Sequence, residues 1–218
     1  MRALTMNSTD PRPTRRTLAI ECATEACSVA LFDGGEILAS DHRVLGRGHA
    51  ERLVPMIAGL PDRGRADRIL VSLGPGSFTG VRIGIATARA LGFAWQADVA
   101  GYPTLALVAT MARAEHPDEA IAACNTAGHG EWFVQQFAAD GSPEDEARSL
   151  VPDDAARSMA ARIVVGTQAE VLVALRGEGL AMALHPDARF ALALPPALLT
   201  HEPRAIYGRA PDAQPPTR

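Results

Sequence analysis

A glycine-rich stretch constrains this chain more than any other part of its sequence. Residues 72–92 read SLGPGSFTGVRIGIATARALG, in which five glycines and one proline surround the start of an otherwise helical segment. Glycine is used where a backbone turns sharply or comes very close to another group. The segment is therefore expected to approach a phosphate, the chain's own sheet or another protein. Its loop positions are Gly74, Pro75, Gly76, Ser77, Phe78, Thr79 and Gly80.

A phosphate-binding loop is the weakest of these three interpretations. Backbone amides at a helix N-terminus attract anions, but a Walker loop ends in Gly-Lys-Ser/Thr, and Thr79, Gly80 and Val81 include no lysine. A dinucleotide loop requires Gly-x-Gly-x-x-Gly, and after Gly74 and Gly76 the third glycine comes one position late. The loop thus predicts no nucleotide cofactor.

The helix after the loop carries a small residue at every fourth position, at Gly80, Gly84, Ala88 and Gly92. A glycine inside a helix costs about 1 kcal/mol relative to alanine, which indicates that another backbone approaches this face. Apolar residues cover most of the remaining circumference, as is typical of a helix buried on more than one side. The small-residue stripe can pack on the chain's own sheet. The apolar residues on the other side of the helix then favour burial against a partner protein.

The segments around this loop predict an α/β fold with a mixed sheet. Three strands in a meander open it, and Asp33, Gly34 and Gly35 form the hairpin turn between the second and third. Pro55 lies inside the first helix and predicts a kink or a late start there. The expected strands of this part are residues 17–23, 26–33, 36–41, 68–73 and 99–102. Its expected helices are 48–60, one that follows the glycine loop and ends at about 96, and 104–115.

The second half of the chain is less regular. It predicts strands over residues 120–125, 131–139, 162–166 and 181–185 and one helix over 167–177. The expected organisation is a leader without structure (1–16), a larger N-terminal lobe (17–115), a reduced C-terminal lobe (116–206) and a C-terminal tail (207–218).

Composition excludes several classes of protein. The 218 residues are 47% hydrophobic and 21% charged, with a net charge of -4, which argues against a chain that grips a phosphate backbone alone. No apolar run approaches the roughly 20 residues of a membrane span. Cys22, Cys27 and Cys124, without a secretory signal, indicate reduced thiols in a cytoplasm.

Side chains with catalytic chemistry form no recognisable set. The six histidines include no H-x-x-x-H pair, so no metal site is predicted. His49 opens a helix close to the glycine loop, where Glu51 and Ser77 are candidates for a catalytic set by residue type only. Glu21 and Thr24 lie in the first hairpin, where the glycines that would let the turn approach a phosphate are absent. The sequence therefore predicts no catalytic, cofactor-binding or metal-binding residue.

Three stretches carry a resemblance to a known family. LAIECATEACSVALFDGGEILA, GHAERLVPMI and GPGSFTGVRIGIATARALG lie within residues 18–92, and YGRAPDA covers 207–213. They resemble the TsaB (YeaZ) family, the dimerisation subunits of the bacterial machinery that makes threonylcarbamoyladenosine on tRNA. Departures from the family pattern are Glu21, where an aspartate is usual, and the stretch NTAGHGEWF at 125–133.

The resemblance implies a two-lobed fold of the actin/Hsp70/sugar-kinase type with a reduced second lobe. It implies a non-catalytic subunit that pairs with the catalytic subunit TsaD, with the TsaE ATPase as a further partner. It also implies a homodimer when the subunit is alone. The net charge of -4 and the lack of a clustered basic face predict weak binding of tRNA by the chain itself, so contact with tRNA is expected only through the complex. The competing hypothesis is an enzyme, either an actin-like ATP-dependent transferase or a glycoprotease-type hydrolase.

We expect the helices at 49–60 and 80–95 to lie side by side and to present a shared apolar surface to a partner. The alternative is that both helices only cover the sheet, with their arginines in solvent. The first helix is expected to contribute His49, Arg52, Leu53, Met56, Ile57 and Leu60. The second is expected to contribute Val81, Arg82, Ile85, Ala88, Arg89 and Gly92.

Overall fold

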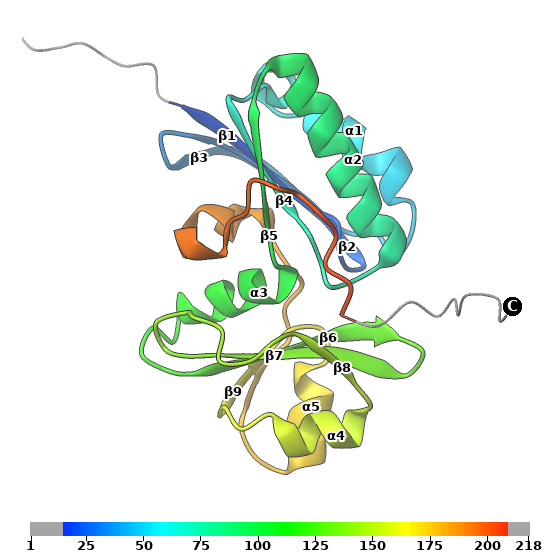
Figure 1. The fold of residues 1–218 in the computed structure, drawn as a ribbon, viewed down its shortest axis with the longest axis vertical. Helices are drawn as coiled ribbons and strands as arrows, with labels where there is room; N and C mark the ends of the chain where they lie inside the picture. Colours follow the sequence, from blue (N-terminus) through cyan, green and yellow to red (C-terminus); the bar gives the residue numbers. More distant parts are fainter. Residues whose placement is uncertain (1–14, 209–218) are drawn as a thin grey trace, which may run out of the picture.

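The chain folds into two lobes, each built on a five-stranded sheet, with one helix between them (Figure 1). A computed structural model describes residues 15–208 of the 218. The strand order is β3-β2-β1-β4-β5 in the first sheet and β10-β9-β6-β7-β8 in the second. In each lobe an antiparallel meander of three strands is continued by two parallel strands, so both sheets follow one topology. The predicted α/β class and mixed sheets are confirmed.

The first lobe holds the long helices. Its strands are β1 (Arg16–Glu21), β2 (Ala26–Asp33), β3 (Glu36–Val44), β4 (Arg68–Ser72) and β5 (Asp98–Tyr102). Its helices are α1 (His49–Ala58) and α2 (Phe78–Trp95), which cover one face of the sheet, and α3 (Thr104–Arg113), which lies against the other lobe (Figure 1). A short 3₁₀ helix, Pro61–Gly64, follows α1.

The second lobe is built from shorter elements. Its strands are β6 (Ile121–Gly128), β7 (Glu131–Phe137), β8 (Arg148–Leu150), β9 (Ile163–Val165) and β10 (Leu180–Met182). Its helices are α4 (Pro152–Ser158) and α5 (Ala169–Arg176). The predicted strand at 181–185 is shorter and begins earlier, and β8 and α4 are elements that the sequence did not predict.

The hairpin turn at residues 33–35 forms as predicted. Gly34 and Gly35 have positive φ angles of 59° and 117°, a conformation that glycine adopts without steric cost. Strands β1 and β2 are almost wholly buried along their length. Strands covered on both faces read as continuous apolar runs, which is why the sequence identified them well. Helix α1 runs through Pro55 without interruption.

The hydrophobic core consists of three apolar clusters, one inside each lobe and one between the two sheets. The first lies between the first sheet and helices α1 and α2, around Ile20, Leu53 and Ala88. The second lies between the two sheets and surrounds α3, which is buried from Thr104 to Ala112. The third lies between the second sheet and helices α4 and α5. Because α3 packs against both sheets, burial of its apolar side chains stabilises the two lobes as one unit.

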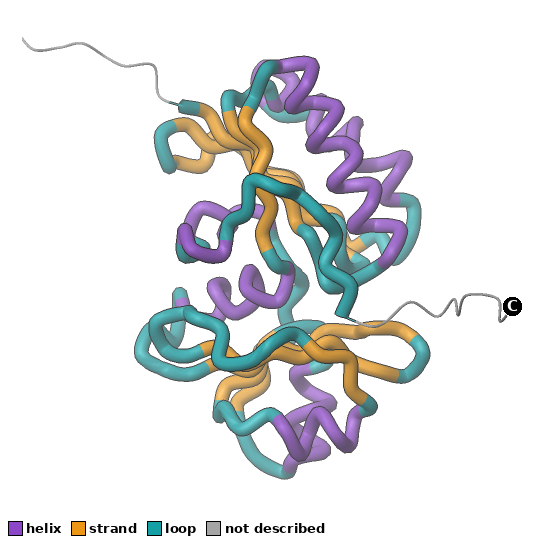
Figure 2. Tube along the Cα trace, in the orientation of Figure 1, coloured by secondary structure: helices purple, strands orange, loops and turns teal. Residues whose placement is uncertain are grey.

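The C-terminal segment returns to the first lobe. After β10, a 3₁₀ helix at Ala188–Ala193 packs on β1 and β2, and the Ala188 amide donates to Ser28 Oγ over 3.0 Å. Thr200 pairs with Gly101, and the Ile206 amide donates to the Leu73 carbonyl over 2.8 Å. Figure 2 shows this stretch as a mainly irregular run along the first lobe. This corrects the expected boundary, because much of 187–206 belongs with the first lobe.

The ends of the chain bear on two further expectations. The leader expected at 1–16 reaches too far, because β1 begins at Arg16. Residues 1–14, and 209–218 of the expected tail, lie outside the described residues. Within 15–208, no helix is both long enough and apolar enough to cross a membrane.

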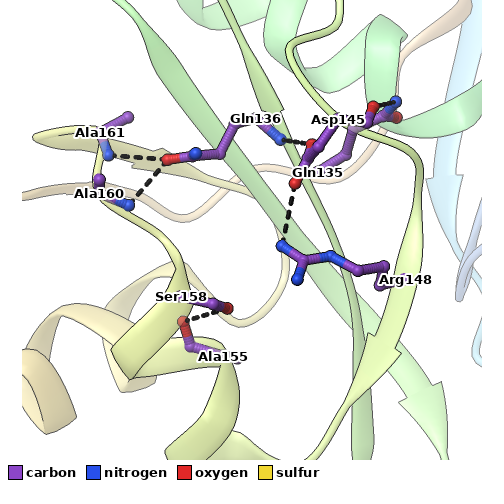
Figure 3. A network of polar contacts seen from close by, with 8 residues as sticks. All are labelled: Gln135, Gln136, Asp145, Arg148, Ala155, Ser158, Ala160 and Ala161. Atoms are coloured by element: carbon purple, nitrogen blue, oxygen red, sulfur yellow. Dashed lines mark hydrogen bonds and ion pairs between the residues drawn. The ribbon is translucent and has the colours of Figure 1, made fainter.

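A side-chain network joins the strands of the second lobe to the chain that follows α4 (Figure 3). Gln136 Oε1 accepts hydrogen bonds from the amides of Ala160 and Ala161, at 2.7 and 3.1 Å. Asp145 accepts from the Gln136 amide at 2.8 Å and from Arg148 Nη2 at 2.9 Å. The short elements of this lobe are thus positioned by polar side chains as well as by apolar packing.

Candidate partner-binding face and interlobe cleft

The glycine loop connects β4 to α2 and contacts the chain's own backbone. A Cβ atom added at Gly76 would lie 2.1 Å from the Ala23 carbonyl oxygen, and one added at Gly80 would lie 2.0 Å from that of Cys22. The Ser77 amide donates to the Ala23 carbonyl over 2.7 Å. The close approach predicted for the loop is therefore real, and the group it approaches is the connection between β1 and β2.

The small-residue stripe of α2 faces the first sheet. At Gly84 an added Cβ would meet Val71 and Cys22 at ordinary distances, and at Gly92 it would lie 2.4 Å from Val99. Ala88 is completely buried in the cluster beneath α2. Of the two interpretations left open for the stripe, packing on the chain's own sheet describes the structure.

Most residues expected at a partner surface instead lie in the core of the first lobe. Burial among α1, α2 and the sheet removes their side chains from the surface, because the amphipathic face of each helix is turned inward. The exceptions are the exposed arginines Arg52, Arg82 and Arg89. The buried members are His49, Leu53, Met56, Ile57, Leu60, Val81, Ile85, Ala88 and Gly92.

The outward side of α2 presents a different set of residues. We define the α2 outer face as Ala86, Arg89, Ala90, Phe93 and Ala94, all of which are exposed. Phe93 is 90% exposed, the highest value among the large apolar side chains of residues 15–208. Beside it, α1 exposes Arg52, Val54 and Pro55. The two helices lie side by side on the same face of the sheet (Figure 1).

Two arginines of α2 hold the C-terminal segment. The Arg82 guanidinium lies 3.4 Å from the centre of the Phe78 ring and donates hydrogen bonds to the Tyr207 hydroxyl at 3.0 and 3.3 Å. Arg89 Nη2 donates to the Pro203 carbonyl over 2.6 Å. These arginines were expected to ring a partner surface, and in the free chain they bind the segment that ends the described residues.

An open cleft of about 580 Å³ lies between the lobes. Its walls are the β1–β2 connection, the N-termini of α1 and α2, and residues 126–128 of the second lobe. His49 Nε2 lies 3.2 Å from the Ala26 carbonyl oxygen, and Ser77 Oγ caps α2 by accepting from the Gly80 amide over 3.2 Å. Both side chains are thus occupied with structural hydrogen bonds. Among the described residues, no three His, Cys, Asp or Glu side chains form a group that could hold a metal ion.

Glu21 is a buried carboxyl group at the end of β1. Burial raises its pKa from 4.5 to about 7, although Oε1 accepts a hydrogen bond from the Ala23 amide over 2.7 Å, which favours the charged form. The Tyr102 hydroxyl, also buried, donates to the Ile20 carbonyl over 2.9 Å. The first hairpin therefore places a carboxyl group beneath the wall of the cleft and away from solvent.

Sequence reasoning missed the α2 outer face and the position of Tyr207. The signal for the face was present, because Ala86, Ala90 and Ala94 recur at helical spacing beside Phe93. If the glycine stripe packs on the sheet, these residues must lie on the opposite, outward side of the helix. The stretch YGRAPDA marked Tyr207 as part of a motif, but a contact 125 residues away in sequence cannot be derived from the motif alone.

The repeated strand order and the helix between the lobes define a two-lobed α/β protein of the actin/Hsp70/sugar-kinase type. A family model described as TsaD, tRNA N6-adenosine threonylcarbamoyltransferase, matches residues 39–190, which is more than half of the chain. The chain belongs to this family, and proteins named TsaB and YeaZ are among those it resembles.

Sequence relatives support this assignment. The chain is 35% identical to the tRNA threonylcarbamoyladenosine biosynthesis protein TsaB of Escherichia coli (strain K12) over 130 residues, 57% of this chain and 56% of that protein. It is 31% identical to TsaB of Bacillus subtilis (strain 168) over 122 residues, 54% and 52% of the two chains. The chain spans about half the length of the curated relatives it matches.

A solved structure extends the likeness to both lobes. YeaZ from Pseudomonas aeruginosa superposes with a TM-score of 0.71 at 32% identity, over 83% of this chain and 90% of that one.

Proposed function

We propose that this chain is a non-catalytic subunit in the biosynthesis of threonylcarbamoyladenosine on tRNA, and that it acts by binding a catalytic subunit of the TsaD type. The observation that carries the proposal is the α2 outer face. Exposed apolar side chains on a helix, flanked by arginines, are typical of surfaces that bind other proteins. The names of the TsaB relatives supply the process.

The state of the cleft supports a subunit without its own chemistry. A general base must be free to reach the proton that it removes. His49 is buried and bonded to a backbone carbonyl, and Ser77 is bonded to the amide of Gly80. His49 and Ser77 therefore maintain the starts of α1 and α2, and the third candidate, Glu51, is an exposed carboxylate on the cleft wall.

The same face serves a homodimer when the catalytic subunit is absent, and TsaE joins as the further partner. Contact with tRNA comes through the complex, because the chain has a net charge of -4. We expect purified chain to bind tRNA weakly, and tight, salt-sensitive binding by the chain alone would contradict this part of the proposal.

Substitution of the outer face tests the proposal. The double variant Phe93→Glu with Ala90→Glu adds two charges at exposed positions, so the fold is retained while a desolvated interface is opposed. We expect affinity for the TsaD-type subunit of the same organism, measured by calorimetry, to fall at least about ten-fold. Val171→Glu, at a half-exposed position on α5 of the second lobe, is the matched control.

The results separate the two hypotheses. Unchanged affinity in the double variant would show that α2 does not form the interface. Failure of the wild-type chain to bind any TsaD-type subunit would contradict the proposed function itself. Stoichiometric, Mg²⁺-dependent binding of ATP by the isolated chain would favour the competing enzyme.

A further inference from the structure

Two cysteines face each other where the first hairpin ends. The β1–β2 register stops at Glu21 opposite Ser28, so Cys22 and Cys27 form the next pair across the hairpin. Their sulfur atoms lie 3.6 Å apart. Opposed residues of an antiparallel pair have Cα atoms about 4.5–5.5 Å apart, which lies within the range of about 4.4–6.8 Å found for disulfides.

All three cysteines are buried, with Cys22 2% and Cys27 0% exposed, but only in the pair does each thiol have the other as its partner. Cys124 is buried in the second lobe, and loss of solvation raises its pKa to about 12. For Cys27, the hydrogen bond with Cys22 lowers the pKa of the thiol, and burial opposes this by raising it. For Cys22, the same hydrogen bond and burial both raise the pKa. Glu21 on β1 and Asp41 on β3 oppose the thiolate of Cys27, and Arg43 on β3 favours it. One member of the pair is therefore the better nucleophile.

The loop between the cysteines connects several parts of the cleft. Residues 23–25 form part of the cleft wall, and Glu25 is partly exposed there, whereas Ala23 and Thr24 are buried. The Ala23 carbonyl accepts from Ser77 at the start of α2, and the Glu25 carbonyl accepts from the amides of Leu45 and Gly46 just before α1. A covalent bond at the base of this loop would restrain the contacts that position both helices.

We propose that Cys22 and Cys27 are a redox-active dithiol that forms a reversible intramolecular disulfide. The oxidant is a low-molecular-weight disulfide such as glutathione disulfide. Both thiols are buried, so the hairpin tip that lines the cleft must open before the oxidant reaches them. The Cys27 thiolate then attacks the glutathione disulfide, forms a mixed disulfide and releases one glutathione thiolate. The Cys22 thiolate then attacks the Cys27 sulfur and releases the second. The protein loses two protons and two electrons, and one glutathione disulfide becomes two glutathione molecules.

The experiment uses the full wild-type chain, folded, in glutathione buffers of stepped oxidised-to-reduced ratio. Free thiols are trapped by acid and alkylated under denaturing conditions, and tryptic peptides are analysed by mass spectrometry. Both cysteines of the pair lie in the peptide 17–43, and Cys124 lies in 114–148, so Cys124 serves as an internal control. Cys27→Ala is the matched variant, and a parallel series in urea gives the unfolded reference.

The expected product is the 17–43 peptide lighter by two hydrogen atoms and resistant to alkylation until it is reduced, while Cys124 remains a free thiol. The folded chain should reach half oxidation at a ratio of oxidised to reduced glutathione at least about ten-fold lower than the urea-unfolded chain, because the fold holds the two sulfurs together. In Cys27→Ala the internal bond should be absent.

Two results would overturn the proposal. One is a folded chain in which both thiols of the 17–43 peptide are still free, and are therefore alkylated, at every ratio. The same conclusion holds if a glutathione adduct accumulates in place of the internal bond. The other is half oxidation at the same ratio in folded and unfolded chain, which would show that the hairpin confers no preference. Neither result depends on partner binding, so the proposed function is tested separately.

Discussion

The two lobes share one strand order but join helix to sheet by different means. In the first lobe α2 has 18 residues and reaches the sheet through glycines, so that backbone lies on backbone. In the second lobe α4 and α5 have 7 and 8 residues, and the Gln136 side chain of β7 binds the chain that follows α4. The first lobe therefore has a long helix whose outer side is exposed, whereas the second lobe is smaller and has only short helices.

The largest expected effect tests the backbone contact of the first lobe. Gly80→Ala places a Cβ 2.0 Å from the Cys22 carbonyl oxygen, where no flexible side chain can yield. We expect the free energy of unfolding, measured with urea, to fall by about 3 kcal/mol or more. Gly84→Ala is the control, since its Cβ meets only ordinary contacts, and we expect a gain of up to about 1 kcal/mol. Equal losses in both variants would mean that helix propensity, not the contact, governs this face.

This pair of glycines also shows what sequence could and could not reveal. The loop and the four-residue stripe predicted close approach of another backbone, which is correct for Gly80. The stripe does not say which backbone, because packing on a sheet and packing on a partner need the same small residues. Burial of Leu53 and Ala88 decides the question, and it depends on how α1 and α2 lie on the sheet.

The second lobe was harder to predict for a physical reason. Its strands β8, β9 and β10 have three residues each. The apolar run at 162–166 still predicted β9, and 181–185 was placed too late for β10, but β8 is too short for an alternating pattern to stand out. Helix α4 contains two aspartates and an arginine and carries a narrow apolar face. The chain just after α4 is bound by Gln136, whose hydrogen-bond partners lie 24 and 25 residues away in the sequence. Secondary-structure propensity does not reveal such contacts.

The second prediction contrasts the carboxyl group of the first lobe with the amide of the second. Glu21 is buried with a pKa raised to about 7, whereas buried Asn125 is neutral and accepts from the Thr167 amide over 3.0 Å. A raised carboxyl pKa means that the folded chain binds the proton more tightly. The contribution of Glu21 to stability is therefore fully present below pH 4.5 and is lost as the pH rises through about 7.

Glu21→Gln should remove that dependence. We expect the variant to gain up to about 3 kcal/mol over wild type at pH 8, and much less at pH 5, in urea unfolding at both values. Glu119→Gln should instead lose a little stability, by the same amount at pH 5 and pH 8, because Arg162 lowers the pKa of the Glu119 carboxyl group and its contribution is lost only below about pH 4.5. A wild-type–variant difference that is the same at pH 5 and pH 8 would show that Glu21 does not titrate in this range.

The third prediction concerns the polar network of the second lobe (Figure 3). Gln136→Leu leaves the amides of Ala160 and Ala161 without their acceptor, and we expect a loss of about 1–2 kcal/mol. Gln136→Glu keeps an oxygen at the same place and should retain most of the stability. The comparison is made by thermal and urea unfolding. An equal loss of stability in both variants would contradict a role for the Gln136 oxygen as hydrogen-bond acceptor.

The smallest expected effect lies where the C-terminal segment crosses α2 in the first lobe. Arg82 stacks on Phe78 and bonds the Tyr207 hydroxyl, but all three side chains are exposed, so solvent weakens each contact. A double-mutant cycle of Arg82→Ala and Tyr207→Phe should give a coupling energy of about 0.5–1 kcal/mol. Phe78→Leu in each member of the cycle separates the stacking contribution from the hydrogen bond. A coupling energy of zero would mean that the segment is held by its other contacts, through Thr200, Ile206 and Arg89, and that Arg82 is free to serve the outer face of α2.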